Sequence, residues 1–523
     1  MRPDGQEEHL NTEKRNNNLI LPGKTPGENG NQMDKHEMLI GRSEVSITPE
    51  KRVGLMGQFI ERISEYTETE VTATAVAISV GDDSVVFCSC DLVGVTAGLV
   101  SAVREKITAA GGPDPDKIII CATHSHTSLC YRDGLDTLEF SSGILNRYFP
   151  YKPAAKTVGE EIMDEEEAFN FLAGRISEAV IRAWEDRKPG YIGFAFGRAA
   201  VGMCRRACYS DGSALMWGDT SADGFVSLEG GNDSGLEIMY FHSADGRPTG
   251  AAVNIACPAQ VLEHRLFISS DYWGKVKKRL RAKFGQDFTV LALCAPAGDQ
   301  CPRDLIRWVE PETPIADPNI TRNGVRKRRA DPSMFDISGA ETVARRIADE
   351  VIGVYESGNY DRAGHEFIHT VRKLRLPIRR VTKEERDLAE KKITEAVSGT
   401  EKESFDYSDN ALLYVYAGTV ARFETQDITP DFEIELHTVR IGDSVVSTSP
   451  FELFLDYGNR IRAKSPAAQT FMIQLACDSL GYLPTEKAEK GGHYSAFVSS
   501  GVTGHVGGDI LVRETLADIN RLF

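Results

Sequence analysis

The chain has 523 residues, 41% of them hydrophobic, so it can bury one large core or two. A formal net charge of −17 and an isoelectric point near 5.3 argue against a surface for nucleic acid or anionic lipid, because phosphate binding requires clustered Lys and Arg. A basic run at 326–329 lies in a segment with Pro and Asp, and we interpret it as a solvated loop.

Cysteine usage and targeting signals indicate the compartment. Ten cysteines are scattered singly and do not form the paired CxxC motifs of a zinc knuckle. We find no signal peptide and no apolar stretch near membrane length. The sequence therefore predicts a cytoplasmic protein in a reducing environment, without a transmembrane segment. It does not indicate an oligomeric state.

The N-terminal part of the chain divides into a leader and the start of a folded domain. Residues 1–37 are rich in Asn, Glu, Lys, Gly and Pro and have almost no apolar periodicity, which predicts a disordered leader. Residues 38–523 then form the folded domain. Its first clear elements are two strands at 72–80 and 84–90, joined by a Gly-Asp-Asp turn.

An amphipathic helix follows these strands. Leu99, Val103 and Ile107 mark its apolar face, and it ends at Gly111-Gly112. It leads directly into a buried strand at 118–121, so the order is strand, helix, strand, as in a crossover unit. The remaining predicted elements are a helix at 169–184, mainly β-structure at 190–260, a helix at 272–284, a strand at 289–294, helices at 340–356 and 383–397, strands at 365–378, 432–448 and 470–477, and a closing helix at 511–522. This mixture predicts a single large α/β domain, with mixed β-sheets flanked by helices.

Two histidines follow the strand at 118–121, in Thr123-His-Ser-His126. In extended backbone the side chains at i and i+2 point to the same face, so His124 and His126 converge and are placed to hold a divalent metal. The alternative is that each imidazole only hydrogen-bonds a neighbouring carbonyl. Other potential ligands also lie where predicted strands end, namely Cys257, Glu452 and Tyr482. Each of these has a structural alternative as a buried thiol, a helix first-turn carboxylate or a packed aromatic ring.

Several spaced motifs resemble the catalytic domain of the neutral (non-lysosomal) ceramidases, which are zinc amidases. The resemblance spans roughly 40–520, with the motifs in the same order. The motifs are the Ser46-Ile-Thr-Pro49 opening with its Gly57 loop, Ala122-Thr-His-Ser-His126, Cys204-Arg205-Arg206, Ile268-Ser-Ser-Asp271, Ala297-Gly-Asp-Gln-Cys-Pro302, Ser449-Pro-Phe-Glu452 and Leu475-Ala-Cys-Asp-Ser-Leu-Gly-Tyr482, with Tyr494 twelve residues further on. The immunoglobulin-like carboxyl-terminal domain of that family is expected to be absent, because the chain ends soon after Tyr494.

The resemblance implies a ceramidase-like fold and a metal-dependent hydrolase of linear amides, acting in sphingolipid or other lipid metabolism. It implies one Zn²⁺, or another divalent metal, whose bound water attacks the acyl carbonyl of a small-molecule or lipid-like amide. The implied roles are metal binding by His124, Cys257, Glu452 and Tyr482, a substrate or outer contact for His126, a substrate contact for Arg205 and an oxyanion donor in Tyr494.

Two cysteines depart from the family pattern. Cys257 stands where the second zinc histidine is expected, and a thiolate there would lower the Lewis acidity of the metal. His264, seven residues on, is an alternative ligand. Cys301 stands where ceramidases carry a serine proposed as nucleophile, so it is either an attacking thiol or an inert buried one. Two other functions therefore stay open: a cysteine amidase or esterase that uses Cys301, and a non-catalytic metal-binding relative.

Overall fold

A computed structural model describes residues 37–131, 143–150, 157–307, 336–398 and 407–523. Residues 1–36 of the predicted leader and the basic run at 326–329 lie outside these described residues. The described residues belong to one compact unit.

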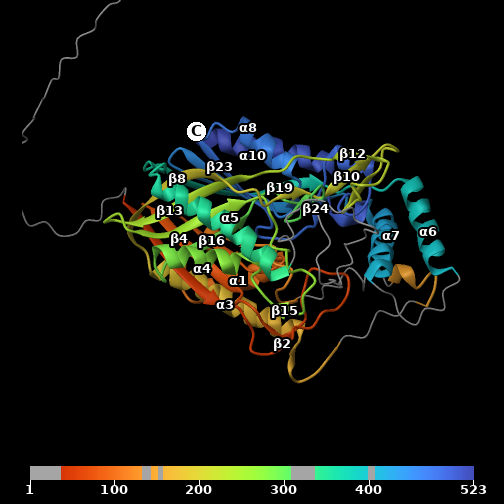
Figure 1. The fold of residues 1–523 in the computed structure, drawn as a ribbon, viewed down its shortest axis with the longest axis horizontal. Helices are drawn as coiled ribbons and strands as arrows, with labels where there is room; N and C mark the ends of the chain where they lie inside the picture. Colours follow the sequence, from red (N-terminus) through yellow and green to blue (C-terminus); the bar gives the residue numbers. More distant parts are fainter. Residues whose placement is uncertain (1–36, 132–142, 151–156, 308–335, 399–406) are drawn as a thin grey trace, which may run out of the picture. The chain divides into compact units, whose positions relative to one another are not determined.

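A nine-stranded mixed sheet dominates the first 300 residues (Figure 1). Its strands run in the order β16-β14-β13-β8-β1-β4-β5-β6, and β18 pairs with β8. The β5·β6 and β14·β16 pairs are parallel, and the other pairs are antiparallel. The strands are β1 (Met38–Ser46), β4 (Thr72–Val80), β5 (Asp83–Cys90), β6 (Ile118–Ala122), β8 (Lys188–Arg198), β13 (Gly235–Ser243), β14 (Pro248–Ile255), β16 (Thr289–Cys294) and β18 (Asp361–Arg362).

A four-stranded sheet, in the order β19-β20-β21-β23, comes from the last third of the chain. Its members are β19 (Phe367–Pro377), β20 (Asp431–Ile441), β21 (Ser444–Thr448) and β23 (Gln469–Ile473). The other short strands pair in small ladders. They are β2 (Arg52–Val53), β3 (Tyr66–Thr67), β7 (Ile162–Met163), β9 (Met203–Cys204), β10 (Arg206–Tyr209), β11 (Ala214–Met216), β12 (Phe225–Leu228), β15 (Phe267–Ile268), β17 (Gln300–Cys301), β22 (Glu452–Leu453) and β24 (Tyr482–Leu483).

The helices are mostly longer than three turns. They are α1 (Ala97–Ala109), α3 (Glu165–Glu185), α4 (Tyr272–Phe284), α5 (Asp336–Glu356), α6 (Lys383–Val397), α7 (Tyr407–Thr425), α8 (Leu455–Lys464), α9 (Glu486–Gly491) and α10 (His505–Leu522). Short 3₁₀ turns at Pro115–Lys117 and Val498–Ser500 accompany them in the described part of the chain. None of the helices in the described part of the chain is long and apolar enough to cross a membrane.

Side chains alternate between two cores along the central strands of the large sheet. In β4, Ala73, Ala75 and Ala77 face the core under α1 and α3, whereas Val76 and Ile78 belong to the core shared with the four-stranded sheet. Because both faces are buried, the strand is almost continuously apolar in sequence.

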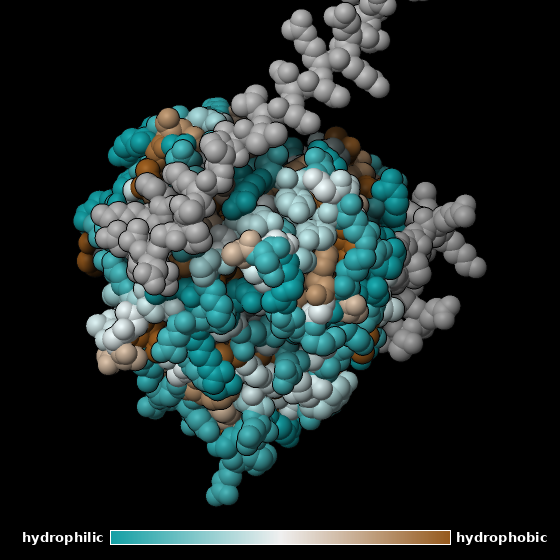
Figure 2. All heavy atoms as spheres, turned by 90° about the vertical axis from the view of Figure 1, so that its left-hand side faces the viewer, coloured by the Kyte–Doolittle hydropathy of each residue, from teal (hydrophilic) through white to brown (hydrophobic). Residues whose placement is uncertain are grey.

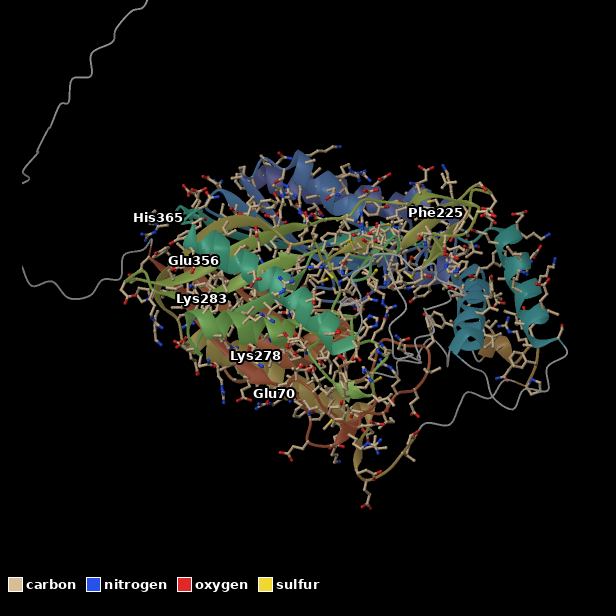
Figure 3. The ribbon with its side chains drawn as sticks, in the orientation of Figure 1. Glu70, Phe225, Lys278, Lys283, Glu356 and His365 are labelled. Carbon is tan, nitrogen blue, oxygen red and sulfur yellow. The ribbon has the colours of Figure 1, made fainter. Side chains whose placement is uncertain are left out.

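The other helices cover the remaining outer faces. Helices α4 and α5 share a core with β8, β13, β14 and β16, while α8 and α10 pack on the four-stranded sheet. Lys283 of α4 and Glu356 of α5 form an ion pair near the ends of their helices (Figure 3). The layers are therefore helices, sheet, sheet and helices. The face shown in Figure 2 is mainly hydrophilic, with apolar side chains in small scattered groups, as expected for a sequence with 26% charged residues.

The fold class is confirmed: the protein is α/β, with mixed sheets flanked by helices. The sequence did not predict α7 and α8. Helix α8 contains Gly458, which disfavours a helix, but a Cβ there would lie 2.6 Å from the ring of Pro296, so the close packing accounts for the glycine.

The strand predicted at 470–477 ends at Ile473. Leu475 and Cys477, at φ of 53° and 60°, turn the chain out of the sheet.

Candidate active site

A tight turn after β6 carries the two histidines. β6 ends at Ala122, and the backbone nitrogens of Thr123 and Ser125 donate to Cys90 O and Leu92 O. His124 has a left-handed φ of 63°, so the residues after β6 are not extended. The two rings still meet edge to face, with centroids 4.7 Å apart. The predicted convergence of His124 and His126 is therefore present, although a turn rather than a strand produces it.

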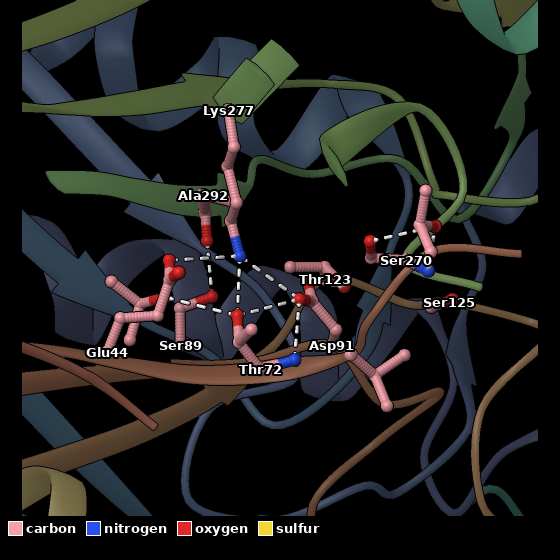
Figure 4. Close-up of polar contacts among 12 residues, drawn as sticks. Glu44, Thr72, Ser89, Asp91, Thr123, Ser125, Ser270, Lys277 and Ala292 are labelled. Carbon is pink, nitrogen blue, oxygen red and sulfur yellow. Dashed lines mark hydrogen bonds and ion pairs between the residues drawn. The ribbon is translucent and has the colours of Figure 1, made fainter. Parts of the chain in front are cut away.

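Hydroxyl groups and a buried ion pair hold this turn in place. Thr123 Oγ1 donates to Asp91 Oδ1 at 3.3 Å, and Asp91 Oδ2 lies 3.1 Å from Lys277 Nζ (Figure 4). Ser125 Oγ and Thr127 Oγ1 both donate to the carbonyl oxygen of Ser269, at 2.8 and 2.9 Å. The histidines thus project from a turn that is fixed to β5, α4 and the segment after β15.

The orientation of His124 is set by its own backbone surroundings. Its Nδ1 lies 2.6 Å from Val93 O, and because a carbonyl only accepts, Nδ1 carries the hydrogen. Nε2 then faces Glu452 Oε2, 3.3 Å away, so a proton or a metal ion has to lie between these two atoms. Such an outer hydrogen bond is the arrangement that fixes a metal-binding histidine.

Glu452 and Tyr482 are brought together by a two-residue ladder. β22 and β24 are parallel, with Glu452 opposite Tyr482 and with Glu452 N bonded to Gly481 O at 2.9 Å. Burial raises the pKa of Glu452, but the positive field of His124 and of Arg205, with a hydrogen bond from Tyr482, outweighs burial and leaves this pKa lowered. The carboxylate is therefore held ionised inside the protein.

Arg205 supplies a buried positive charge next to this pair. It lies between β9 and β10, only 3% exposed, and donates to Gln260 Oε1 (3.2 Å), Gly298 O (2.9 Å) and the Tyr482 hydroxyl (3.2 Å). Burial works to lower the pKa of Arg205, but Tyr482, Cys301 and Glu452 outweigh it and raise the pKa, so the guanidinium stays charged. Its Nε is buried and has no hydrogen-bond partner, which leaves one donor for a ligand.

Tyr494 completes the aromatic side of the site. Its ring lies edge-on to Tyr482, with centroids 5.5 Å apart, and also contacts Phe59 at 5.6 Å. Burial, then the charge of Glu452, raises the pKa of both phenols, so each keeps its proton and can donate a hydrogen bond.

His126 is a buried imidazole whose two ring nitrogens both lack a hydrogen-bond partner. Its Nδ1 lies 3.4 Å from Glu263 Oε2. Burial, reinforced by His124, Arg62 and Arg205, lowers its pKa well below the ordinary value, so the ring is neutral near neutral pH. A Cβ at Gly57 would come within 2.7 Å of this ring, which explains the glycine there.

Sequence reasoning missed three residues behind His126. Gln260 Nε2 donates to Glu263 Oε2 at 3.2 Å, and Arg303 Nη2 donates to Glu263 Oε1 at 3.3 Å. Gln260 and Glu263 are each 2% exposed. The available signal was a Gln and a Glu three residues apart within the apolar run that follows Pro258, since buried polar side chains need partners.

The structure does not bring Cys257 to this cluster. Its Sγ lies 3.6 Å from Val201 O and 3.7 Å from Pro258 O, inside the core under α4. Among the described residues, His124, Cys257 and Glu452 are not a group whose ligand atoms all lie within 4.8 Å of one another. Burial raises the pKa of Cys257 well above the ordinary value, so this thiol is protonated. His264, the alternative ligand, is half-buried.

Cys301 lies at the edge of the cluster in β17. Its Sγ is 3.2 Å from Arg303 O and accepts from Arg303 N at 3.4 Å, and the side chain is fully buried. Burial raises its pKa to about 12, even though Arg205 opposes the shift. A thiol with such a pKa is a weak nucleophile near neutral pH.

The fold is similar to that of two solved ceramidase structures. Neutral ceramidase from Pseudomonas aeruginosa superposes with a TM-score of 0.64 over 93% of this chain and 75% of that chain, at 17% sequence identity. A ceramidase complexed with C2 superposes with a TM-score of 0.62 over 92% and 74%, at 16% identity. The fold is neutral-ceramidase-like. No family model and no curated protein matches the sequence.

The donor set of the cluster fits a divalent cation. His124 Nε2 faces the ionised Glu452, and His126 Nε2 is buried without a hydrogen-bond partner. Imidazole nitrogen and carboxylate oxygen are ligands of zinc and related metals.

Proposed function

We propose that the protein is a hydrolase of amide bonds and that the cluster around His124 and Glu452 is its active site. The carrying observation is that His124, Arg205, Glu452 and Tyr482 converge from four distant segments into one buried polar cluster. Within the cluster, Arg205 Nε and His126 Nε2 are buried and have no hydrogen-bond partner, so each is open to a ligand. The neutral-ceramidase-like fold supports the same reaction class.

In this proposal a divalent metal, zinc or another, is held by His124, Glu452 and Tyr482. Cys257 is left out, because its sulfur faces the core under α4. A bound metal would supply Lewis acidity that makes its water a nucleophile near neutral pH. The chain prepares the site by fixing the Nδ1–H tautomer of His124 on Val93 O and by keeping Glu452 ionised.

The other side chains act on the substrate. Tyr494 keeps its hydroxyl proton and can donate to the oxyanion that forms at the carbonyl carbon, where one such donor contributes about 3 kcal/mol. Arg205 holds the carbonyl oxygen through its free Nε. His126 directs Nδ1 at Glu263, so its Nε2 can accept the proton of the attacking water.

The proposed substrate is an N-acyl amide, ceramide or a smaller amide, cleaved to an amine and a carboxylic acid. We place the whole activity in one catalytic domain, residues 38–523. A reducing cytoplasm remains our expectation for its location, supported by ten cysteines that are all free thiols.

The test uses the purified full chain with and without metal. Metal content is measured, the protein is treated with a chelator, and hydrolysis is followed on N-acyl amides from a short-chain ceramide to N-acetylated amines. We expect turnover that chelation removes and zinc restores. Turnover that survives complete metal removal would refute the metal-dependent mechanism. Absence of turnover of any amide while metal is bound would instead favour a non-catalytic metal-binding relative.

A further inference from the structure

A second group of ligand-type side chains lies outside the candidate active site. Glu435 and His437 are two residues apart on β20 and so share one face of the strand. Cys477, on the turn after β23, meets them: His437 Nε2 lies 2.8 Å from Glu435 Oε1 and 3.6 Å from Cys477 Sγ. Among the described residues, these three form the group of His, Cys and acidic side chains whose ligand atoms all lie within 4.8 Å of one another.

A hydrogen-bond chain behind His437 determines which of its nitrogens has a lone pair. His369 Nδ1 lies 2.9 Å from Ser84 O, a carbonyl that can only accept, so Nδ1 carries the hydrogen of neutral His369. His369 Nε2 is then an acceptor for His437 Nδ1, 3.0 Å away. His437 therefore donates from Nδ1 and directs Nε2 at Glu435.

The contact between His437 and Glu435 requires a positive charge. In neutral His437 the Nε2 lone pair would face a carboxylate oxygen only 2.8 Å away. Either a proton or a metal ion must lie between two such acceptors. The thiol of Cys477 beside the same nitrogen favours the metal ion over the proton, because sulfur is a poor hydrogen-bond partner but a strong ligand for zinc-class metals.

The spacing of the three atoms suits one ion. Zinc bound tetrahedrally to a nitrogen and a sulfur at their usual bond lengths separates them by about 3.6 Å, and the observed separation of Sγ and Nε2 is 3.6 Å. The corresponding nitrogen–oxygen separation is about 3.3 Å, so Glu435 would withdraw by about half an ångström from its 2.8 Å contact.

The surroundings have the features of a metal site. His437 is oriented by His369. Glu435 Oε2 accepts from Arg104 Nη1 at 3.1 Å and from Lys373 Nζ at 3.0 Å, and Oε1 accepts from Arg104 Nη2 at 2.6 Å, so the ligands have outer partners of their own. Glu435 and Cys477 line a pocket of about 700 Å³, which gives an ion a way in and leaves room for a further ligand. Arg104 and Lys373 already neutralise the charge of Glu435. The negative charge that offsets a divalent ion therefore has to come from the thiolate of Cys477.

We propose that Glu435, His437 and Cys477 bind one zinc-class divalent metal ion through Oε1, Nε2 and Sγ. On binding, the S–H bond of Cys477 breaks and its proton leaves to solvent, so that the thiolate coordinates. The ion joins β20 to the turn after β23. Cys477 N donates to Ile120 O at 2.8 Å, so the ion lies beside the strand that leads to His124. This site is separate from the proposed active site and does not depend on its activity.

The test is an anaerobic titration with Co²⁺ of the full chain after a chelator has removed its metal. A thiolate ligand produces an intense near-ultraviolet charge-transfer band, which nitrogen and oxygen ligands do not. We expect the band at saturation to report one thiolate-bound Co²⁺ per chain, and Cys477→Ser to abolish it. Glu435→Gln should keep the band but weaken Co²⁺ binding on the order of 10- to 100-fold. Circular dichroism of each variant checks folding.

Control variants separate this site from the other thiols and from the active site. Cys257→Ser, Cys208→Ser and Glu452→Gln should each keep the band, because their side chains lie outside the group. A wild type without the band would overturn the proposal and leave a proton between His437 and Glu435. A band that survives Cys477→Ser in folded protein but disappears in Cys257→Ser would also overturn it, by assigning the thiolate to the core cysteine.

Discussion

His124 Nε2 lies 3.3 Å from Glu452 Oε2, although the two residues come from opposite ends of the folded chain. One hydrogen bond, to Val93 O, aims the imidazole, and one backbone ladder, opposite Tyr482, aims the carboxylate. Each partner is thus placed by backbone rather than by the other side chain. This preorganisation is what a metal site or an active site requires.

Removing the charge of Glu452 should remove most of the activity. Glu452→Gln keeps the shape of the side chain, but a neutral amide is a poor ligand and no longer balances Arg205. We expect kcat/KM to fall on the order of 100-fold or more, with loss of bound metal. Glu341→Gln on α5, which breaks only a half-exposed ion pair with Arg279 of α4, is the matched control. Equal activities of the two variants would contradict the assignment.

Tyr494→Phe tests the oxyanion donor. Loss of one such donor costs on the order of 100- to 1000-fold in kcat, with little change in KM, because the hydrogen bond forms mainly in the transition state. Tyr457→Phe also deletes a buried hydroxyl, which donates to Pro484 O at 2.8 Å, and should leave kcat unchanged. Steady-state kinetics on the best amide distinguishes them. A rise in KM alone would make Tyr494 a ground-state contact.

Cys301→Ser should retain hydrolysis. The thiol is fully buried and its pKa of about 12 keeps it protonated, so it does not act as a nucleophile near neutral pH. Serine can keep the polar contact with Arg303. The measurements are kcat/KM and inactivation by iodoacetamide, with Cys208→Ser as a control thiol. Loss of activity in folded Cys301→Ser but not in Cys208→Ser would revive the cysteine amidase.

Lys277→Met should destabilise the protein by about 3–5 kcal/mol, because it leaves Asp91 buried without its cation. The turn that carries His124 would lose support as well, since Thr123 donates to the same carboxylate. Urea unfolding measures the loss. Lys278→Met, at the exposed neighbouring position, should cost little, and Asp91→Asn in the Lys277→Met background should restore part of the stability. Equal effects at 277 and 278 would contradict the pairing.

The stability of the protein should also fall in acid through Glu44. Burial raises the pKa of Glu44, but the charges of Lys277 and Arg281 outweigh burial and leave it lowered from 4.5. A carboxyl with a lowered folded pKa binds more protons when unfolded, so its contribution is present above the unfolded pKa and is lost as the pH falls through the folded one.

Glu44→Gln removes that titration. Its unfolding free energy should therefore decline less steeply than that of the wild type between about pH 5 and about pH 3. Urea unfolding at several pH values measures the two slopes, and Glu70→Gln, at an exposed position, serves as the control. If the unfolding free energy changed equally with pH in wild type and Glu44→Gln, this contribution would be ruled out.

The pattern of the sequence predicted most of the fold but only part of the site. Strands buried on both faces, such as β4 and β6, have unmistakable apolar runs. The end of the buried strand before Thr123 was predicted as well. The left-handed φ of His124 was not, because no glycine marks it and the histidines were expected on extended backbone.

Partners contributed by tertiary structure were the hardest to predict. Glu263 became a site residue only through the packing of its turn against His126, and Cys257 left the site because its side chain turned into the core under α4. A motif match predicts which residue occupies a position in the fold. It does not predict the direction of the side chain, which depends on packing.

The ladder between β22 and β24 has a consequence for recognising distant homologues. Two parallel strands cannot be joined by a hairpin and need an excursion of a dozen residues or more, which α8 and β23 provide here. Only the paired dipeptides Glu452-Leu453 and Tyr482-Leu483 have to keep their alignment. Insertions or deletions in the excursion would leave carboxylate and phenol side by side, so homologues are better sought by these two short anchors than by a constant gap.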